Sequence, residues 1–199
     1  MTKNKSCQRL ILAISGASGA VYGLTALKLL KHAGVESHLV VSRAAALSLG
    51  VETHLSLAEV HDLADVVYKP GDIGAAIASG SFKTMGMLIA PCSIKSLSEI
   101  ATGVTSTLVS RAADVCLKER RRLVLMVRES PLHLGHLRSM TAVTEMGAIV
   151  APPMPALYTR PQSIDEMVAQ SVGRALDLFD IDVDIQRWQG LSGEKSAST

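Results

Sequence analysis

LILAISGASGAVYG, at residues 10–23, predicts a strand, a tight turn and a helix in immediate succession. Residues 10–14 form a short apolar run that suits a strand buried on both faces of a parallel sheet. Gly16 and Gly19 let the backbone turn sharply, and from Ala20 onward apolar residues recur at helical spacing. Such a turn directs free backbone N–H groups and the helix dipole at one point. The stretch therefore predicts a site for phosphate.

Three interpretations of this turn imply different chemistry. Ser18 stands where G-x-G-x-x-G needs its second glycine, so a standard NAD site is not expected. Gly16-x-Ser18-x-Ala20 resembles a nucleophile elbow that lacks its final glycine. Only nine residues precede the strand, however, and an α/β-hydrolase needs several strands before its elbow. The third interpretation is a turn of small residues that only lets helix and strand pack closely.

Composition indicates a globular chain with an aliphatic core. The 199 residues are 48% hydrophobic but include only two Phe, three Tyr and one Trp. We expect one domain over residues 1–188 and a polar tail over residues 189–199. Mean hydropathy is +0.29 without an apolar run near 20 residues, which predicts surface buried between subunits rather than a membrane span. The net charge of +2 predicts no nucleic-acid partner.

Cysteine usage and the N-terminus favour the cytoplasm. Lys3, Lys5 and other early cations imitate a secretory signal, but the apolar run after them is too short. Cys7, Cys92 and Cys116 are odd in number and lack C-x-x-C spacing, which fits a reducing compartment and predicts no metal site. A small buried thiol is the expected state of Cys92, because no base adjoins it in sequence.

The chain alternates strand-like and helix-like segments, which predicts a doubly wound parallel sheet in a three-layer α/β/α arrangement. The strands are expected at residues 10–14, 36–41, 66–68, 85–90, 123–127 and 148–151. Helices are expected to start at residues 20, 42 and 94, to span residues 56–64, 105–122 and 163–179, and to end before the last strand at residue 147. Residues 71–81 lack a pattern and suit either a mobile loop or a close-packed interface.

Polar residues follow several of these strands at the edge where ligands of open α/β sheets bind. Ser42 is a plausible N-cap that could also reach a ligand on the first turn. Residues 93–96 offer N–H groups, two hydroxyls and an ammonium, a second anion cradle. Arg128 and Glu129 place a cation and a carboxylate at the same edge.

Other candidates have plain structural interpretations. The cations of residues 118–122 complement a helix C-terminus, with a substrate patch as the alternative. His133 and His136 suit a helix start better than a metal site, since no third ligand is evident. Four prolines in residues 152–162 predict a stiff loop. Ser163 and Glu166 then predict a capping box, and Arg174 alone would be interpreted as a surface residue.

Taken together, several blocks resemble the UbiX-type flavin prenyltransferases, over residues 9–188. The blocks are residues 16–20, Ser42, residues 91–93, 111–115, 117–121 and 128–131, and Tyr158 with residues 161–163. The resemblance implies a flavodoxin-like homododecamer with FMN at a trimer interface. It also implies transfer of a dimethylallyl group from dimethylallyl phosphate to reduced FMN, at N5 and then C6, without a metal. The prenylated FMN would serve a UbiD-type decarboxylase, as in ubiquinone biosynthesis.

The resemblance also implies roles for individual residues. Those expected to hold FMN are Gly16, Ala17, Ser18, Ser42, Ser93, Ile94, Lys95, Ser96 and Arg128. Tyr158 and Arg174 are expected to bind the donor phosphate. The catalytic candidates are Ser18, Glu52, Arg111, Lys118 and Glu129. Some members carry a Trp in the loop equivalent to residues 71–81, and its absence here leaves donor orientation and length open.

Two other functions stay open. Flavoprotein cysteine decarboxylases share the fold and FMN, but they resemble a P-x-M-N pattern where this chain has Pro152-Pro153-Met154-Pro155. The third possibility is a non-catalytic, FMN-carrying accessory subunit of a decarboxylase.

Overall fold

The computed structural model describes residues 8–190, whose strands form one parallel sheet of six. The strands are β1 Arg9–Ile14, β2 Glu36–Val41, β3 Val66–Tyr68, β4 Gly86–Cys92, β5 Arg122–Val127 and β6 Ile149–Val150. Their order is β3-β2-β1-β4-β5-β6, and every pairing is parallel. This confirms the predicted doubly wound sheet. In such an order, strands β1 to β3 are added toward one edge of the sheet and β4 to β6 toward the other. The winding therefore changes direction between β1 and β4, and ligands of open α/β sheets bind at this point.

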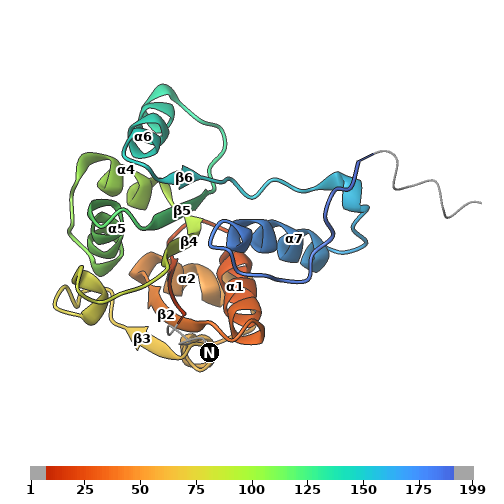
Figure 1. Cartoon of the computed structure of the whole chain (residues 1–199), viewed down its shortest axis with the longest axis horizontal. Coiled ribbons are helices and arrows are strands. Elements are labelled where there is room, and N and C mark those ends of the chain that lie inside the picture. Colours follow the sequence, from red (N-terminus) through yellow and green to blue (C-terminus); the bar gives the residue numbers. More distant parts are fainter. Residues whose placement is uncertain (1–7, 191–199) are drawn as a thin grey trace, which may run out of the picture.

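Helices cover both faces of the sheet (Figure 1). One face carries α1 Ala20–His32, α2 Arg43–Glu52, α3 Leu57–His61 and α7 Ile164–Asp177. The other face carries α4 Ile94–Thr102, α5 Leu108–Lys118, α6 Leu134–Glu145 and the short 3-10 helix η1 Ala76–Ala78. A second 3-10 helix, η2 Leu157–Thr159, lies between β6 and α7. The arrangement is the predicted three-layer sandwich.

The two cores are aliphatic, as the composition predicted. Alternate residues of β1 enter opposite cores: Leu12 and Ile14 pack toward α1 and α7, whereas Ile11 and Ala13 pack toward α5. All four are buried. A strand covered on both faces needs a continuous apolar run, which is why the period-two alternation of a half-exposed strand is absent from the sequence.

Two glycines of the opening stretch are required by close approaches. A Cβ on Gly16 would lie 2.4 Å from the Cβ of Ala44, and a Cβ on Gly23 would lie 2.6 Å from the carbonyl oxygen of Ala90. Gly19 adopts a left-handed conformation (φ 106) before α1 begins. Close packing of helix on strand is therefore one real role of this stretch.

The helix predicted over residues 105–122 was wrong at both ends. It begins only at Leu108, because Thr107 and Ser110 cap one another reciprocally. It ends at Lys118, and Arg120 then takes a left-handed conformation (φ 56) that turns the chain into β5. The predicted run of cations thus spans a helix end, a turn and the first residue of a strand.

The C-terminal predictions also needed correction. Ser163 caps α7 by accepting from the Glu166 backbone N–H, but the Glu166 carboxylate accepts from Gln162 N–H at 2.7 Å instead of closing the capping box. The helix α7 ends at Asp177 rather than at residue 179. Strand β6 is two residues long where four were predicted.

The last 20 residues are sparse in apolar periodicity, which predicts a frayed or partner-packed tail, but residues 181–188 of this stretch pack on their own chain. Ile181 and Val183 are buried in the core beside α1 and α7. Figure 1 shows this dark blue segment running back along α7 toward η2. Of the predicted polar tail, residues 191–199 lie outside the described residues, as does Cys7.

Residues 71–81 form a loop that packs closely within this chain. Ile77 of η1 is 1% exposed and belongs to the core beneath α5. Arg121 donates hydrogen bonds to the carbonyl oxygens of Gly80 and Phe82, at 2.5 and 2.7 Å. The part of the loop around η1 therefore packs closely, on the chain itself, whereas residues 71–74 are exposed, so the close-packed alternative holds for that part alone.

Candidate active site

Ser15 connects the carboxyl ends of β1 and β4, the two strands between which the winding changes direction. Its hydroxyl donates to the Pro91 carbonyl oxygen at 2.8 Å and accepts from the Ser93 backbone N–H at 2.7 Å. The outer neighbours are tied in as well, since Ser42 N–H donates to Ile14 and Arg128 N–H donates to Cys92. Sequence reasoning missed Ser15, although a serine directly after a buried strand was a usable signal.

A cavity of about 670 Å³ opens at this edge of the sheet. That volume is typical of sites for cofactors and small molecules. Seven residues predicted for the site line it, namely Gly16, Ser42, Ser93, Ile94, Lys95, Ser96 and Glu129. The other lining residues are Arg43, Ala44, Pro70, Gly71, Glu99, Ser106, Thr107 and Val109. Ala17, Ser18 and Arg128 were predicted for the same ligand but do not line the cavity.

The cavity wall is built from two capped helix starts. Ser42 Oγ accepts from Ala45 N–H at 3.1 Å, and Ser93 Oγ accepts from Ser96 N–H at 3.3 Å. The remaining N–H groups of each first turn have no partner within their helix. Both helix dipoles add positive potential there, and Lys95 is an exposed cation on the same wall, paired with Glu99 at 3.1 Å. The wall suits an anion such as a phosphate.

The shape and polarity of this cavity fit FMN. The floor at Gly16 has no room for a side chain, because a Cβ there would overlap Ala44. The first-turn N–H groups of Ile94 and Lys95, at the start of α4, are suited to a phosphate. This fit rests on the cavity and its donors alone.

The anion site predicted at the start of α1 is filled by a side chain. Glu52, the last residue of α2, accepts from the N–H groups of Gly19 and Ala20 at 2.8 and 2.9 Å. Partial burial raises the pKa of Glu52, but the two backbone hydrogen bonds, the Ser18 hydroxyl and the charge of Arg128 outweigh it and lower the pKa below 4.5. The structure thus brings Ser18, Glu52 and Arg128 together.

Arg128 closes this cluster from the end of β5. A Cβ on Gly19 would lie 3.2 Å from Arg128 Cδ, so the arginine stem lies directly over the turn. Glu129 points its carboxylate at its own loop, where it accepts from Ser130 N–H at 2.9 Å. Ala17 is buried beneath the turn.

Arg111 and Lys118 do not reach the cavity. Arg111 pairs with Asp114 at 2.8 Å and Lys118 pairs with Glu119 at 2.6 Å. Lys118 ends α5 only four residues before β5 begins at Arg122, so it lies at the amino edge of the sheet. A six-residue strand spans about 17–20 Å, and the cavity lies at its opposite end.

Tyr158 and Arg174 lie apart from the cavity as well. Arg174 lines a separate pocket of about 200 Å³ with Met126 and Met154, and forms an ion pair with Asp177. Tyr158 stands in η2, where its ring meets Trp188 edge-on with centroids 5.5 Å apart. The 670 Å³ cavity that the FMN candidates line includes neither of these two donor candidates.

The sequence as a whole matches known proteins closely. The Flavoprotein family model matches residues 1–175. The flavin prenyltransferase UbiX of Neisseria meningitidis serogroup B is 56% identical over 186 residues, which cover 93% of this chain and 98% of the relative. This chain belongs to the UbiX family of flavin prenyltransferases.

Solved structures of the UbiX type agree with that assignment. A UbiX crystal structure in complex with FMN and dimethylallyl pyrophosphate has a TM-score of 0.91 and 47% identity, covering 92% of this chain and 98% of the other. A dodecameric FMN-dependent Ubix-like decarboxylase from Escherichia coli O157:H7 has a TM-score of 0.89 and 45% identity, covering 92% and 100%.

Other candidate features are structural in this UbiX family member. Burial raises the pKa of Cys92 and of Cys116 to about 12, so both remain thiols. His133 caps α6 by accepting from Gly135 N–H at 3.0 Å. Residues 8–190 contain no group of three side chains suited to a metal ion and no helix long and apolar enough to cross a membrane.

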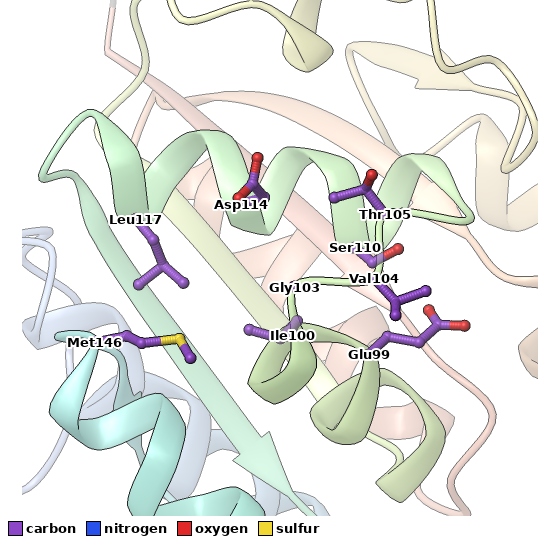
Figure 2. Close-up of a pocket in the computed structure, with 9 residues that line it drawn as sticks. All are labelled: Glu99, Ile100, Gly103, Val104, Thr105, Ser110, Asp114, Leu117 and Met146. Atoms are coloured by element: carbon purple, nitrogen blue, oxygen red, sulfur yellow. The ribbon is translucent and has the colours of Figure 1, made fainter.

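A smaller cavity lies on the side of the sheet covered by α4, α5 and α6 (Figure 2). It measures about 120 Å³, well below the size of a cofactor site. Its floor includes Ile100, and Leu117 and Met146 lie together at one end, as Figure 2 shows. Asp114 at its rim is already paired with Arg111. We regard it as a packing gap between the helices.

Proposed function

We propose that this protein binds reduced FMN in the 670 Å³ cavity and transfers a dimethylallyl group to it from dimethylallyl phosphate. The observation that supports the proposal most strongly is that the capped N-termini of α2 and α4 line one cavity, at the carboxyl ends of β1 and β4. Membership of the UbiX family supplies the chemistry. The relative solved with FMN and dimethylallyl pyrophosphate supports FMN and a dimethylallyl phosphate ester as the ligands.

The reaction balances without a redox partner. The donor's C1–O bond breaks and the phosphate departs with the electron pair. C1 then bonds to flavin N5, which loses its proton. For ring closure, C2 of the prenyl group takes up a proton, C3 bonds to C6, and C6 releases its proton. An allylic C–O bond breaks readily only when positive charge stabilises the leaving phosphate. The allyl cation that forms must also be kept from water. Arg and Lys side chains supply that charge.

The cluster of Ser18, Glu52 and Arg128 stands in a suitable place for proton handling beside the cavity. A lowered pKa keeps Glu52 ionised at neutral pH, so its carboxylate can accept a proton, directly or through the Ser18 hydroxyl. Glu129 lines the cavity and is a second acceptor. Departing phosphate is the third candidate base. Arg128 is proposed to hold FMN.

The separation of the candidate residues supports a site shared between subunits. Lys118 lies at the amino edge of the sheet, so it can reach reacting groups only in a neighbouring copy. Arg111, Tyr158 and Arg174 are not at that edge but do not line the cavity either, so they too are proposed to act on the site of a neighbouring copy. We propose a homododecamer with each site at a trimer interface. The dodecameric relative from Escherichia coli O157:H7 supports that state.

In the cell, the product is proposed to serve a separate UbiD-type decarboxylase that acts on aromatic acids, as in ubiquinone biosynthesis. The prenylated flavin must leave this cavity to be used there. A cytoplasmic location and a single domain over residues 1–188 complete the proposal.

The test is product identification with the purified protein alone. FMN is reduced with dithionite and mixed with the protein and dimethylallyl phosphate under anaerobic conditions. The flavin is then analysed by mass spectrometry. We expect FMN to gain one five-carbon unit. Unchanged FMN would contradict the proposal and favour an accessory carrier. Decarboxylation of a C-terminal cysteine peptide with unchanged FMN would favour the cysteine decarboxylase alternative.

A further inference from the structure

The segment 181–188 is fixed along α7 by backbone and side-chain contacts. A Cβ on Gly173 would lie 2.4 Å from Ile185 Cγ2, so helix and segment touch where the helix has no side chain. Gln170 Nε2 donates to the Gln186 carbonyl oxygen at 2.7 Å. Val183 is buried against the same helix. The next residue after this anchor, Arg187, is therefore held close to α7.

Asp177 stands between two arginines at the end of α7. Arg187 donates twice to its carboxylate, at 2.7 and 2.9 Å, in the two-pronged geometry that fixes a guanidinium most firmly. Arg174 donates to the same carboxylate from the preceding helical turn. The Asp177 side chain is 13% exposed, whereas those of Arg174 and Arg187 are 56% and 46% exposed.

The charge of this three-residue cluster depends on Arg187. A single carboxylate paired with Arg174 alone would cancel the charge of that arginine. With Arg187 present, two cations share one anion and the cluster keeps a net positive charge. The only other anion within ion-pair distance of the described cluster, Asp182, is fully exposed and 3.5 Å away, so solvent screens it.

The same segment also holds Tyr158. Its hydroxyl donates to the Gln186 carbonyl oxygen at 3.4 Å, and its ring contacts Trp188. Of the two residues proposed to bind the donor, Tyr158 thus contacts this segment directly, and Arg174 is linked to it through Asp177.

We propose that Asp177 and Arg187 are positioning residues for the prenyl donor: Asp177 fixes Arg174, and Arg187 keeps the cluster cationic so that Arg174 can bind the donor phosphate. This inference rests on the proposed function and adds two residues to it. Neither residue was singled out by the sequence. The chemistry concerned is recognition of an alkyl monophosphate by a cluster with one net positive charge.

The test compares Arg187→Gln with the double variant Asp177→Asn/Arg187→Gln. Donor affinity is measured by calorimetry with dimethylallyl phosphate on protein that holds oxidised FMN, which is not prenylated. We expect Arg187→Gln to weaken donor binding on the order of tenfold, the size of one lost charge-assisted interaction. In the double variant the asparagine that replaces Asp177 still has one oxygen that can accept from Arg174, and the net charge is restored, so part of that loss should be recovered. FMN occupancy should stay at the wild-type level in both.

Two controls separate charge from structure. Asp182→Asn removes only the exposed partner and should leave donor affinity unchanged. Arg187→Lys keeps the charge and should bind the donor better than Arg187→Gln. Wild-type affinity in Arg187→Gln, or a double variant no better than the single one, would overturn the inference while the proposed function stands. Wild-type protein that neither binds nor uses dimethylallyl phosphate would overturn both.

Discussion

The Glu52 carboxylate binds Gly19 N–H at the start of α1, where the sequence predicted a site for a ligand phosphate. Its Oε2 lies 2.8 Å from the backbone nitrogen of Gly19, although 33 residues separate the two in the chain. A carboxylate at a helix N-terminus is stabilised by the helix dipole and by N–H groups that otherwise lack partners. The start of α1 is thus an anion site, but the anion belongs to the protein.

Replacing Glu52 by Gln tests this cap. The variant keeps one acceptor and loses the charge, so we expect the free energy of unfolding to fall by about 0.3–1 kcal/mol at pH 7. The pKa of Glu52 is lowered in the folded state, so its stabilisation is present above pH 4.5 and is lost as pH falls through the folded pKa. Urea unfolding of both proteins should therefore converge in acid. A difference that stays constant with pH would contradict a charge-based cap.

Gly23→Ala should destabilise the fold. The new methyl group would lie 2.6 Å from both the Ala90 carbonyl oxygen and Ile14 Cγ1, and overpacking of this kind costs about 1–3 kcal/mol. The matched control is Gly50→Ala in α2, where no atom lies within 4 Å. That change should stabilise by about 0.5–1 kcal/mol, because alanine favours a helix. Thermal melts of the two variants should move in opposite directions.

His38 should make stability depend on pH. It is buried between Tyr68 and Glu36, with Nδ1 2.9 Å from the Tyr68 hydroxyl and Nε2 2.9 Å from Glu36 Oε1. Burial lowers the pKa of His38 below 6.5, although the hydrogen bond to Glu36 opposes this. The unfolded chain then takes up the proton first, so stability falls as pH drops below 6.5. His38→Gln should flatten melting temperature between pH 7.5 and about 5.5. An unchanged slope would rule this histidine out.

Arg128→Ala and Arg174→Ala should fail in different ways. Arg128 does not line the cavity itself, but it lies over the turn at Gly19, next to the cavity residue Gly16, and is proposed to hold FMN, so its loss should lower FMN retention first. Arg174 lies outside the FMN cavity, so its loss should leave FMN bound and lower kcat/KM for the donor roughly ten- to more than a hundredfold. Flavin occupancy and single-turnover prenylation are measured for both. An Arg174→Ala protein that has lost its flavin, or that turns over normally, would contradict the assignment.

The sheet and the serine caps were predictable because their signals are local. Five-residue apolar runs predicted the buried strands, and Ser42 and Ser93 follow strands directly, where a helix must be capped. The sequence left a ligand site and close packing open for the opening turn, and the close approach of Gly23 to Ala90 shows that packing is one role of this stretch.

The long-range pairs were not predictable from one sequence. Glu52 reaches Gly19 only because the ends of β1 and β2 are neighbours, so spacing along the chain carries no trace of the contact. Arg187 likewise meets Asp177 because residues 181–188 fold back on α7. The early stop of α5 depended on Arg120 taking a left-handed conformation, which is uncommon for arginine.

The most direct test of the account is the stoichiometry of a single turnover. Protein loaded with reduced FMN is mixed anaerobically with limiting dimethylallyl phosphate, and inorganic phosphate and the modified flavin are quantified from the same samples. If the protein transfers the prenyl group to FMN, phosphate and prenylated flavin should appear in equal amounts and at the same rate. Phosphate released without a matching modified flavin would show hydrolysis of the donor and would contradict the proposed transfer.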